Sequence, residues 1–384
     1  MMKVLFLSAW YPNRNDVMSG LFVRKHAEAV SKYCDVEVLY VHPDKTLKNF
    51  QISVSAENGI IETFIYYPVN LLGIGNMFTK FFNYLKAYHI GFKIVHKSGF
   101  SPDIVHANIL TRTGFIAYLY KKWKNVPYVI TEHWSRYLPI RNSYKGLFRK
   151  KLTKFVVKNA QAVFPVSENL RTAMLNHKLE NLNYTVINNT VDPCFAIEIK
   201  PQPRTKKRIL HVSCFDELAK NVRGILNATY ELSKKRNDFE LVLIGNGIDF
   251  DEIYQYAQSL NFEPGILKFT GEKTPSEVAE WFYNSDFFVL FSNYENSPVV
   301  VAESLFCGKP LISTNVGGIS EHVNDSNGIL IPAGDENALI QNIDYMLDHF
   351  QEFNSEEIKA VARQKFSMES IGNLLYEQYK QCVK

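Results

Sequence analysis

The feature that most constrains this chain is a repeated alternation of short apolar runs with longer amphipathic stretches. The runs are rich in Val and Ile, and continuous apolar strands separated by helices predict parallel sheets covered on both faces. In the first half we expect strands at 3–7, 36–41, 103–107, 127–131, 162–166 and 184–188. In the second half we expect them at 208–213, 240–244, 266–270, 287–291, 310–313 and 328–331.

Two such series in 384 residues predict two doubly wound α/β domains. Between them, prolines stand among charged residues without any periodicity, which is typical of a linker. We therefore expect a first domain at 1–192, a linker at 193–207 and a second domain at 208–366. The last segment, 367–384, has apolar residues on one helical face and is expected to pack back on the first domain.

Composition excludes several classes of protein. There is no run of about 18 apolar residues, so we expect no transmembrane helix. The first apolar stretch lacks a small-residue cleavage site and predicts a buried strand, not a signal peptide. The five cysteines are scattered without a C-x-x-C pair. They predict neither a zinc site nor a disulfide framework, and they favour the cytoplasm. No D-x-D pair or ligand cluster indicates a metal, so we expect no metal and no cofactor.

The charge is divided unevenly along the chain. Residues 1–200 carry a net charge of +13 and residues 201–384 a net charge of −9, which suggests different partners for the two halves. Between Arg136 and Lys158 there are eight basic residues and no acidic one. Apolar side chains at helical spacing accompany them, which fits either an anionic bilayer or a core helix with a solvated face. The basic patch consists of Arg149, Lys150, Lys151 and Lys154. We do not expect nucleic acid as a partner.

The stretch 294–335 is the most informative about chemistry. After the strand ending at 291, Ser297 is expected to cap a helix that begins at Pro298. This loop lies at the carboxyl end of a strand, where open α/β sheets bind ligands, and a helix N-terminus suits a diphosphate. Glu295 and Glu303 can accept hydrogen bonds from sugar and ribose hydroxyls. The sequence N-V-G-G at 315–318 permits close backbone approach to an anion.

These elements, in this order, resemble the donor-site pattern of glycosyltransferase family 4: S-x-x-E-x7-E, then G-x-P, then a G-G turn and a Glu three residues on. The matching positions are Ser292, Glu295, Glu303, 308–310, Gly317, Gly318 and Glu321. The resemblance implies a GT-B fold, with two Rossmann-like domains facing a central cleft. It also implies metal-independent, retaining transfer of a sugar from a UDP- or GDP-linked donor. The implied acceptor is a glycan or a lipid-linked molecule of cell-surface polysaccharide biosynthesis, which would bring a cytoplasmic protein to the inner face of the membrane.

The resemblance also implies roles for single residues. Glu295 would contact the transferred sugar, and Glu303 would bind the ribose. Lys220 matches the lysine that binds the donor diphosphate, and His133 matches a histidine near the reacting sugar. The remaining positions implied at the donor are Gly20, Gly271, Asn296, Ser297, Pro298, Val299, Gly317 and Gly318. The family's second cation falls on Phe215, and Arg223 is a hypothetical substitute for it.

Three other interpretations remain open at this point. A nicotinamide-dependent dehydrogenase could share the layout, but no G-x-G-x-x-G follows the first strand, and the sequence at 245–250 lacks the third glycine. A catalytically silent protein that binds sugar nucleotides or glycans is favoured slightly by the missing arginine. A sugar-nucleotide epimerase could use the same fold.

Overall fold

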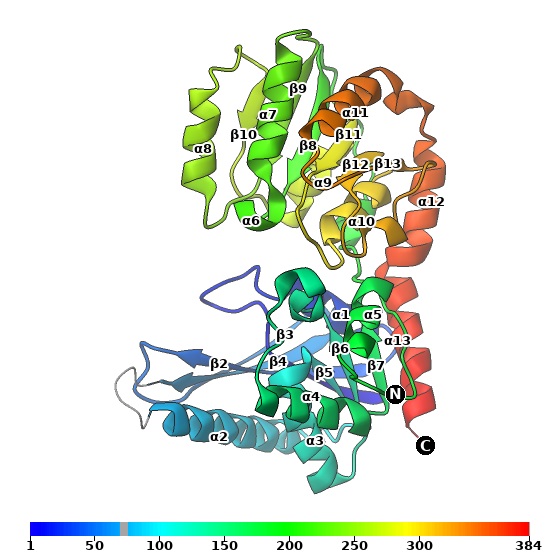
Figure 1. The fold of residues 1–384 in the computed structure, drawn as a ribbon. Coiled ribbons are helices and arrows are strands. Elements are labelled where there is room, and N and C mark those ends of the chain that lie inside the picture. The colour runs from blue at the N-terminus through cyan, green and yellow to red at the C-terminus, as the bar shows by residue number, and fades with distance from the viewer. Residues whose placement is uncertain (70–75, 384) are drawn as a thin grey trace. The chain divides into compact units, whose positions relative to one another are not determined.

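The computed structural model describes residues 1–69 and 76–383. Its internal contacts divide the chain into two compact units, drawn in Figure 1. The first unit comprises Met1–Asn189 together with Met368–Lys384, and the second comprises Thr190–Ser367. Each unit is an α/β sandwich built on a mainly parallel sheet, which confirms the predicted fold class.

The first unit contains a seven-stranded sheet with the order β3-β4-β2-β1-β5-β6-β7. Every pair of neighbours is parallel except β3 and β4, which are antiparallel. The strands are β1 (Lys3–Ser8), β2 (Asp35–Asp44), β3 (Gln51–Glu57), β4 (Ile60–Pro68), β5 (Ile104–Asn108), β6 (Tyr128–Glu132) and β7 (Ala162–Pro165).

Helices cover both faces of this sheet because its strands are apolar on both sides. In β1, Leu5 packs into the core on one face while Val4 and Phe6 pack into the core on the other. The first face is covered by α2 (Asn76–Lys97), α3 (Leu110–Lys124), α4 (Leu147–Asn159) and α5 (Glu168–Asn176). The second is covered by α1 (Leu21–Ser31) and α13 (Met368–Cys382). Two short 3-10 turns, Ser135–Tyr137 and Pro139–Arg141, follow β6.

The C-terminal helix α13 is a structural part of the first unit. It crosses α1 so closely that a Cβ on Gly372 would lie 2.2 Å from the carbonyl oxygen of Ala29. Its buried Tyr379 hydroxyl lies 2.6 Å from Nδ1 of His106 on β5. The apolar face that the sequence predicts for 367–384 therefore packs on this unit.

The second unit contains a six-stranded, fully parallel sheet with the order β10-β9-β8-β11-β12-β13. The strands are β8 (Lys207–Val212), β9 (Phe239–Ile244), β10 (Leu267–Phe269), β11 (Phe287–Leu290), β12 (Leu311–Thr314) and β13 (Gly328–Ile331). One face carries α7 (Val222–Ser233), α8 (Phe250–Ser259) and α11 (Glu336–His349). The other carries α9 (Pro275–Tyr283), α10 (Val299–Phe306) and α12 (Ser355–Phe366), while the one-turn α6 (Glu217–Lys220) precedes α7.

Two predicted features of the first half differ from the structure. The strand expected at 184–188 is reduced to an isolated bridge between Val163 and Tyr184. The hairpin β3–β4 was not predicted, although its turn is Asn58-Gly59, with φ of 50° and 78°. Positive φ at both turn residues is what a two-residue hairpin requires, so this dipeptide was the available signal.

The segment predicted as a linker, 193–207, packs on the second unit instead. It begins with a short 3-10 helix, Pro193–Ala196, in which Phe195 is fully buried. The Tyr283 hydroxyl of α9 donates to the Phe195 carbonyl oxygen at 2.8 Å, and Arg204 forms an ion pair with Asp286. The buried Phe195 and the ion pairs of Glu198 and Arg204 fix a segment whose composition alone suggested a free connection.

We expect Gly372→Val to destabilise the protein, because its side chain would overlap the α1 backbone at Ala29. Overpacking of this kind costs about 1–3 kcal/mol or more. Asn373→Ala, at an exposed position of the same helix, is the matched control. Urea unfolding followed by circular dichroism measures both. An unchanged free energy of unfolding in Gly372→Val would contradict the close packing of α13 on α1.

Candidate functional site

A buried ion pair lies at the carboxyl edge of the second sheet. Lys220 ends α6, and its Nζ donates to Oε1 of Glu295, in the loop after β11, at 2.5 Å. The two side chains are only 14% and 9% exposed. Ser292 Oγ donates to the same carboxylate oxygen at 2.8 Å. The structure thus brings together the predicted lysine and the predicted sugar-binding glutamate.

The pair keeps Lys220 charged although it is buried. Burial lowers the pKa of the Lys220 ammonium, but the charge and hydrogen bond of Glu295, together with Cys214 and Asp216, raise it by more, and the net pKa lies above its ordinary value. An ammonium carries three N–H donors. Within the described residues, Glu295 is the one hydrogen-bond acceptor of Lys220. Two donors are therefore available to an anionic ligand.

The glycine turn after β12 is pressed against the Glu295 loop. Gly317 has φ of 59°, and a Cβ there would lie 2.1 Å from the carbonyl oxygen of Glu295. The next residue, Gly318, donates its N–H to the carbonyl oxygen of Asn296 at 2.8 Å. Only glycine fits at position 317, because the conformation is left-handed and the backbones touch. The structure therefore joins the predicted N-V-G-G turn and the Glu295 loop into one surface.

The helix after this loop begins one residue later than predicted. Its first residue is Val299, and Pro298 occupies the N-cap position with an extended ψ of 120° and no side-chain cap. The prediction that Ser297 is the N-cap is therefore wrong. The first turn of α10 contains no acidic residue, and the first N–H groups of a helix have no acceptor within the helix. The loop before this helix end contains Asn296, Ser297 and Pro298, and Val299 is the first helical residue.

Glu303 lies on the second turn of α10 and is partly buried. Within the described residues its carboxyl group has no hydrogen bond or ion pair. Burial, together with the charge of Asp192, raises the pKa of Glu303 to about 8. The carboxyl group is therefore mostly protonated at neutral pH when no ligand is bound, and it can both donate and accept a hydrogen bond.

The other residues of the second unit that the sequence singled out lie in different surroundings. Gly271 follows β10 with φ of 71°, and a Cβ built there would meet no atom within 4 Å. Phe215, at the position of the missing cation, is fully buried and packs against Phe250 at a ring distance of 5.4 Å. Arg223 is directed to α8, where it pairs with Glu252 at 3.4 Å. The hypothesis that Arg223 replaces the missing cation is therefore not supported.

In the first unit, Gly20 and His133 follow β1 and β6 at the carboxyl edge of the sheet. Gly20 is the N-cap of α1 with φ of 64°, and a Cβ there would lie 2.3 Å from the Trp10 carbonyl group. His133 Nε2 lies 3.3 Å from Oδ1 of Asn108. Burial, and then the nearby His26 and His106, hold the pKa of His133 well below its usual range, so the imidazole is neutral.

Several buried polar groups around His133 were not predicted. His26 on α1 has its ring 5.5 Å from that of His133. The carboxylate of Glu132 accepts backbone hydrogen bonds from Leu110, His133 and Trp134 at 2.8–3.0 Å. Burial raises the pKa of Glu132 to about 7, against these hydrogen bonds. Its position at the end of an apolar strand was the one sequence signal for it.

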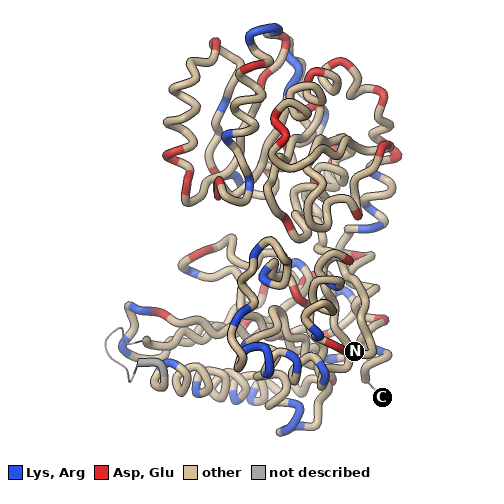
Figure 2. Tube along the Cα trace, in the orientation of Figure 1, with Lys and Arg blue, Asp and Glu red and all other residues tan. Residues whose placement is uncertain are grey.

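The basic patch lies on α4, and Figure 2 shows Lys and Arg gathered on α3 and α4. Val156 and Val157 of α4 are buried in the core, as a packed helix requires. On its other side, Leu147 and Phe148 are 81% and 80% exposed, and Phe155 is 42% exposed. They stand beside the patch residues, of which Arg149, Lys151 and Lys154 are exposed and Lys150 is half-buried. Helix α4 therefore combines a core face with an exposed, basic and apolar face.

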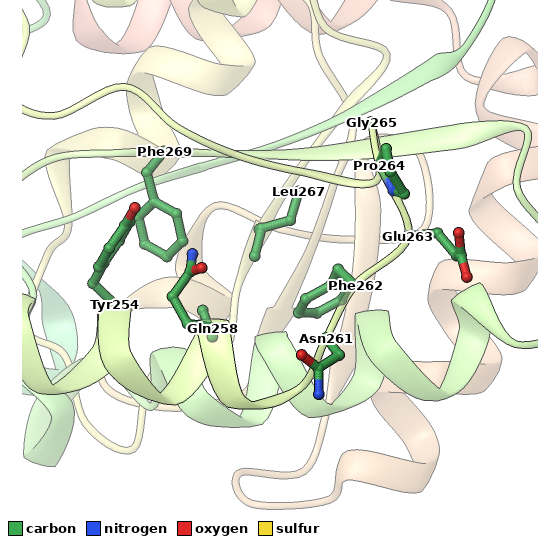
Figure 3. A pocket seen from close by; sticks show the side chains of 10 residues that line it. Tyr254, Gln258, Asn261, Phe262, Glu263, Pro264, Gly265, Leu267 and Phe269 are labelled. Carbon is green, nitrogen blue, oxygen red and sulfur yellow. The ribbon is translucent and has the colours of Figure 1, made fainter.

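A separate pocket of about 380 Å³ lies between α8 and β10 (Figure 3). Tyr254, Gln258, Phe262, Leu267 and Phe269 line it together with the loop that joins the helix to the strand. None of the predicted site residues contributes to it, so it is not part of the candidate site.

Within residues 1–69 and 76–383, no group of three His, Cys, Asp or Glu side chains is arranged to hold a metal ion. In the same residues, no helix has the length and apolarity needed to cross a membrane.

Family models match both units. The model described as Glycosyltransferase Family 4 matches residues 23–194, and the model described as Glycosyl transferases group 1 matches residues 206–349. Among curated proteins, an uncharacterised glycosyltransferase of Methanocaldococcus jannaschii is 28% identical, covering 93% of this chain and 90% of the relative. The N-acetyl-alpha-D-glucosaminyl L-malate synthase of Bacillus anthracis is 27% identical, covering 61% and 62%.

Solved structures share the fold over the whole chain. A sucrose-phosphate synthase of Thermosynechococcus elongatus superposes with a TM-score of 0.77 at 18% identity, covering 99% of both chains. HepE of Anabaena, in complex with UDP, superposes with a TM-score of 0.75 at 18% identity, covering 99% of this chain and 100% of HepE. At this identity the likeness establishes the fold, that of GT-B glycosyltransferases.

The raised pKa of Glu303 predicts a pH-dependent stability. The folded protein holds this proton with a pKa of about 8, whereas an ordinary glutamate has a pKa of 4.5. The stability that the protonated Glu303 contributes is therefore lost as the pH rises from about 4.5 to about 8. Glu303→Gln cannot ionise, so we expect it to be more stable than the wild type at pH 8 by about 1–3 kcal/mol.

Urea unfolding at pH 5 and at pH 8 measures this difference. Glu357→Gln, which removes an exposed carboxylate on α12, is the control and should follow the wild type at both pH values. If Glu303→Gln loses as much stability as the wild type between pH 5 and pH 8, the protonated state of Glu303 is wrong.

Proposed function

We propose that this chain, which belongs to glycosyltransferase family 4 and has the GT-B fold, transfers a sugar from a nucleotide-diphosphate sugar. The transfer retains the configuration at the anomeric carbon. The observation that supports this most is the Lys220–Glu295 pair at the carboxyl edge of the second sheet, pressed against Gly317. It combines a buried cation, a helix N-terminus and a glycine turn on one surface. Sugar transfer in polysaccharide or glycolipid biosynthesis is the general activity of such proteins.

The donor diphosphate would bind to the second unit. Lys220 has two N–H donors beyond the one used by Glu295, and α10 begins directly after the same loop. A helix N-terminus and an ammonium group together suit a diphosphate. HepE of Anabaena, which shares the fold, has been solved with UDP and with UDP-glucose. UDP- and GDP-linked sugars are therefore the donors to test.

Glu295 and Glu303 would hold the two sugars of the donor. The carboxylate of Glu295 is fixed by Lys220 and Ser292 through one oxygen, Oε1, which leaves Oε2 for hydroxyls of the transferred sugar. The protonated Glu303 can exchange hydrogen bonds with both ribose hydroxyls, because it is donor and acceptor at once. His133 of the first unit is neutral and would orient the sugar or the acceptor as a hydrogen-bonding group.

The reaction breaks the bond between the anomeric carbon and the diphosphate oxygen and forms a bond from that carbon to the acceptor oxygen. The proton of the acceptor hydroxyl passes to the leaving diphosphate on the same face of the sugar, which retains the configuration. Negative charge develops on the diphosphate, so a fixed cation and helix dipole stabilise this transition state most. Lys220 and the N-terminus of α10 supply this stabilisation, and we propose no metal or other cofactor.

The acceptor would be a glycan or a lipid-linked molecule at an anionic membrane surface. Relatives of this chain include a putative teichuronic acid biosynthesis glycosyltransferase and an enzyme named for a diphospho-undecaprenol substrate. The exposed face of α4 offers Leu147 and Phe148 to a bilayer, flanked by cations. Each basic residue near an anionic surface contributes about 1 kcal/mol before screening. We therefore propose peripheral attachment at the inner face of the membrane through the first unit.

A protein that binds sugar nucleotides without transferring the sugar is the second candidate. The observation that favours it is the burial of Phe215 in the core, which leaves Lys220 without the second cation of the family pattern. Turnover of a panel of UDP- and GDP-sugars with glycan and lipid-linked acceptors distinguishes the two. Nucleotide binding without any turnover would favour the silent protein.

We expect Lys220→Ala to lower the turnover about a hundredfold or more, because loss of one such stabilising group costs roughly 3–4 kcal/mol of transition-state stabilisation. Added Mg²⁺ should not restore it. Glu295→Ala should lose transfer while it still binds UDP or GDP, whereas Glu303→Ala should weaken nucleotide binding itself. Lys235→Ala, an exposed lysine of the same unit, is the control. Full turnover in Lys220→Ala, or wild-type activity that disappears with a chelator, would contradict the mechanism.

We expect the wild type to sediment with liposomes in proportion to their anionic lipid content, and less so at high salt, because screening weakens surface attraction. Lys151→Glu/Lys154→Glu should abolish this binding. Lys234→Glu/Lys235→Glu makes the same charge change on the second unit and should bind like the wild type. If the wild type stays in the supernatant with anionic liposomes at low salt, the membrane proposal is wrong and the acceptor is soluble.

A further inference from the structure

Most arginines of this protein are neutralised by carboxylates. Ion pairs are formed by Arg14, Arg24, Arg171, Arg204, Arg208, Arg223, Arg236 and Arg363. Arg141 has interaction partners as well. Within the described residues, the arginines without any ion pair are Arg112, Arg136 and Arg149, and all three belong to the first unit. An arginine without a counter-ion is unremarkable alone, but three together need an explanation.

The three residues converge at the carboxyl edge of the first sheet. Arg112 lies in the first turn of α3, just after β5, and Arg136 lies in the 3-10 turn that follows β6. Arg136 Nη1 lies 3.5 Å from the hydroxyl of Thr111, the residue before Arg112. Arg149 lies in the first turn of α4. We call Arg112, Arg136 and Arg149 the arginine cluster.

Arg136 is held in place without being satisfied. Its guanidinium carbon lies 3.2 Å from the centre of the Trp134 ring, in a cation–π contact. Its Nε is buried and has no hydrogen-bond partner in the described structure. In the described structure the buried Nε atoms of Arg171 and Arg223 have no hydrogen-bond partner either, and Arg136 differs from them because its guanidinium forms no ion pair.

The positive charge of the cluster is only partly compensated. The pKa of the Arg136 guanidinium is lowered first by burial and then by the positive charges of Arg149 and Arg112, against opposing effects of Tyr137 and Glu132. Glu132 does not neutralise the cluster by an ion pair, because its two oxygens accept the backbone N–H groups described above. The local field is therefore positive, and an anion would be attracted to it.

The backbone beside the cluster has an unusual conformation. Helix α3 has no acidic residue in its own first turn, and the carboxylate of Glu132 accepts the N–H of its first residue, Leu110. Its N-cap residue is Ile109, which has φ of 69° and ψ of 102°. A β-branched residue in this region is strained, and such strain is concentrated at functional sites. The strained turn sets the direction in which Thr111 and Arg112 leave β5.

We propose that the arginine cluster binds a phosphoryl group of the acceptor. Guanidinium groups present paired N–H donors that match phosphate oxygens in two-pronged hydrogen bonds, and Trp134 holds the guanidinium of Arg136 through a cation–π contact. The proposal rests on the proposed function, because it identifies the acceptor class of that reaction. A phosphate can be carried by a membrane lipid or by a soluble sugar phosphate, and the chemistry of recognition is the same for both.

Titration with inorganic pyrophosphate, followed by calorimetry, tests the site on the full chain. Four proteins are compared: the wild type, Arg112→Gln/Arg136→Gln, Lys220→Ala and the control Arg171→Gln, whose arginine is paired with Glu168 on the surface of the same unit. We expect two binding events in the wild type and in the control. In the arginine variant the affinity of one binding event should fall at least tenfold. In Lys220→Ala the other binding event should be lost.

The outcomes separate this inference from the proposed donor site. If the arginine variant titrates like the wild type, the cluster does not bind phosphate, and the donor site is unaffected by that result. If Lys220→Ala binds like the wild type while the arginine variant does not, the donor site is wrong and the cluster stands. Thermal unfolding checks that the variants are folded. Arg112→Gln alone, at an exposed position, supplies a second test and should weaken the same event.

Two further ligands identify the source of the phosphate. Geranyl diphosphate and glucose 1-phosphate are titrated into the wild type and into the arginine variant, with UDP and GDP present in excess to occupy the donor site. Tighter, cluster-dependent binding of the prenyl compound indicates a lipid-linked acceptor, and tighter binding of the sugar phosphate indicates a soluble one. If neither compound distinguishes the wild type from the variant, the acceptor does not present a phosphate to the cluster.

Discussion

The buried ion pair between Lys220 and Glu295 is the interaction on which the candidate donor site depends. Two charges removed from water are tolerated only when each is paired and hydrogen-bonded, and here Ser292 supplies an additional hydrogen bond to the carboxylate. Gly317 presses on the backbone of Glu295 and permits no side chain of its own. A parallel sheet places the ends of β8, β11 and β12 at one edge, so residues 75 positions apart meet there. The positive charge of Lys220, which would stabilise a leaving diphosphate, is thus held in place before any ligand binds.

The charged groups of the two units differ in how they are neutralised. In the second, which is acidic overall, one lysine is kept charged by one glutamate, while the carboxyl group of Glu303 is kept protonated by burial. In the first, which is basic overall, His133 is neutral, and within the described residues no arginine of the cluster forms an ion pair. A site that must bind and release an anionic donor benefits from a compensated cation. A site that selects an anionic acceptor benefits from an uncompensated one.

The sequence predicts the fold well because parallel strands are apolar on both faces and therefore stand out as continuous runs. It fails where tertiary contacts override composition: Phe195 fixes a segment that resembles a linker, and the segment 184–188 retains only one bridge. The ordered motif around Glu295 predicts residues that the structure brings together. It could not predict that Arg223 turns to Glu252, that Pro298 displaces Ser297 as the N-cap, or that three arginines converge, because those outcomes depend on neighbours distant in sequence.

Hydrogen–deuterium exchange with UDP and then with GDP tests the central claim most directly, namely that the second unit binds a nucleotide diphosphate at the Lys220–Glu295 surface. Amides at a helix N-terminus and in a glycine turn exchange readily until a ligand accepts their hydrogen bonds. We predict that at least one of the two nucleotides slows exchange at the amides of Val299 and Gly317, while the α8–β10 pocket lined by Gln258 and Phe269 does not change. If neither nucleotide slows exchange at these amides, the assignment of the donor site is contradicted.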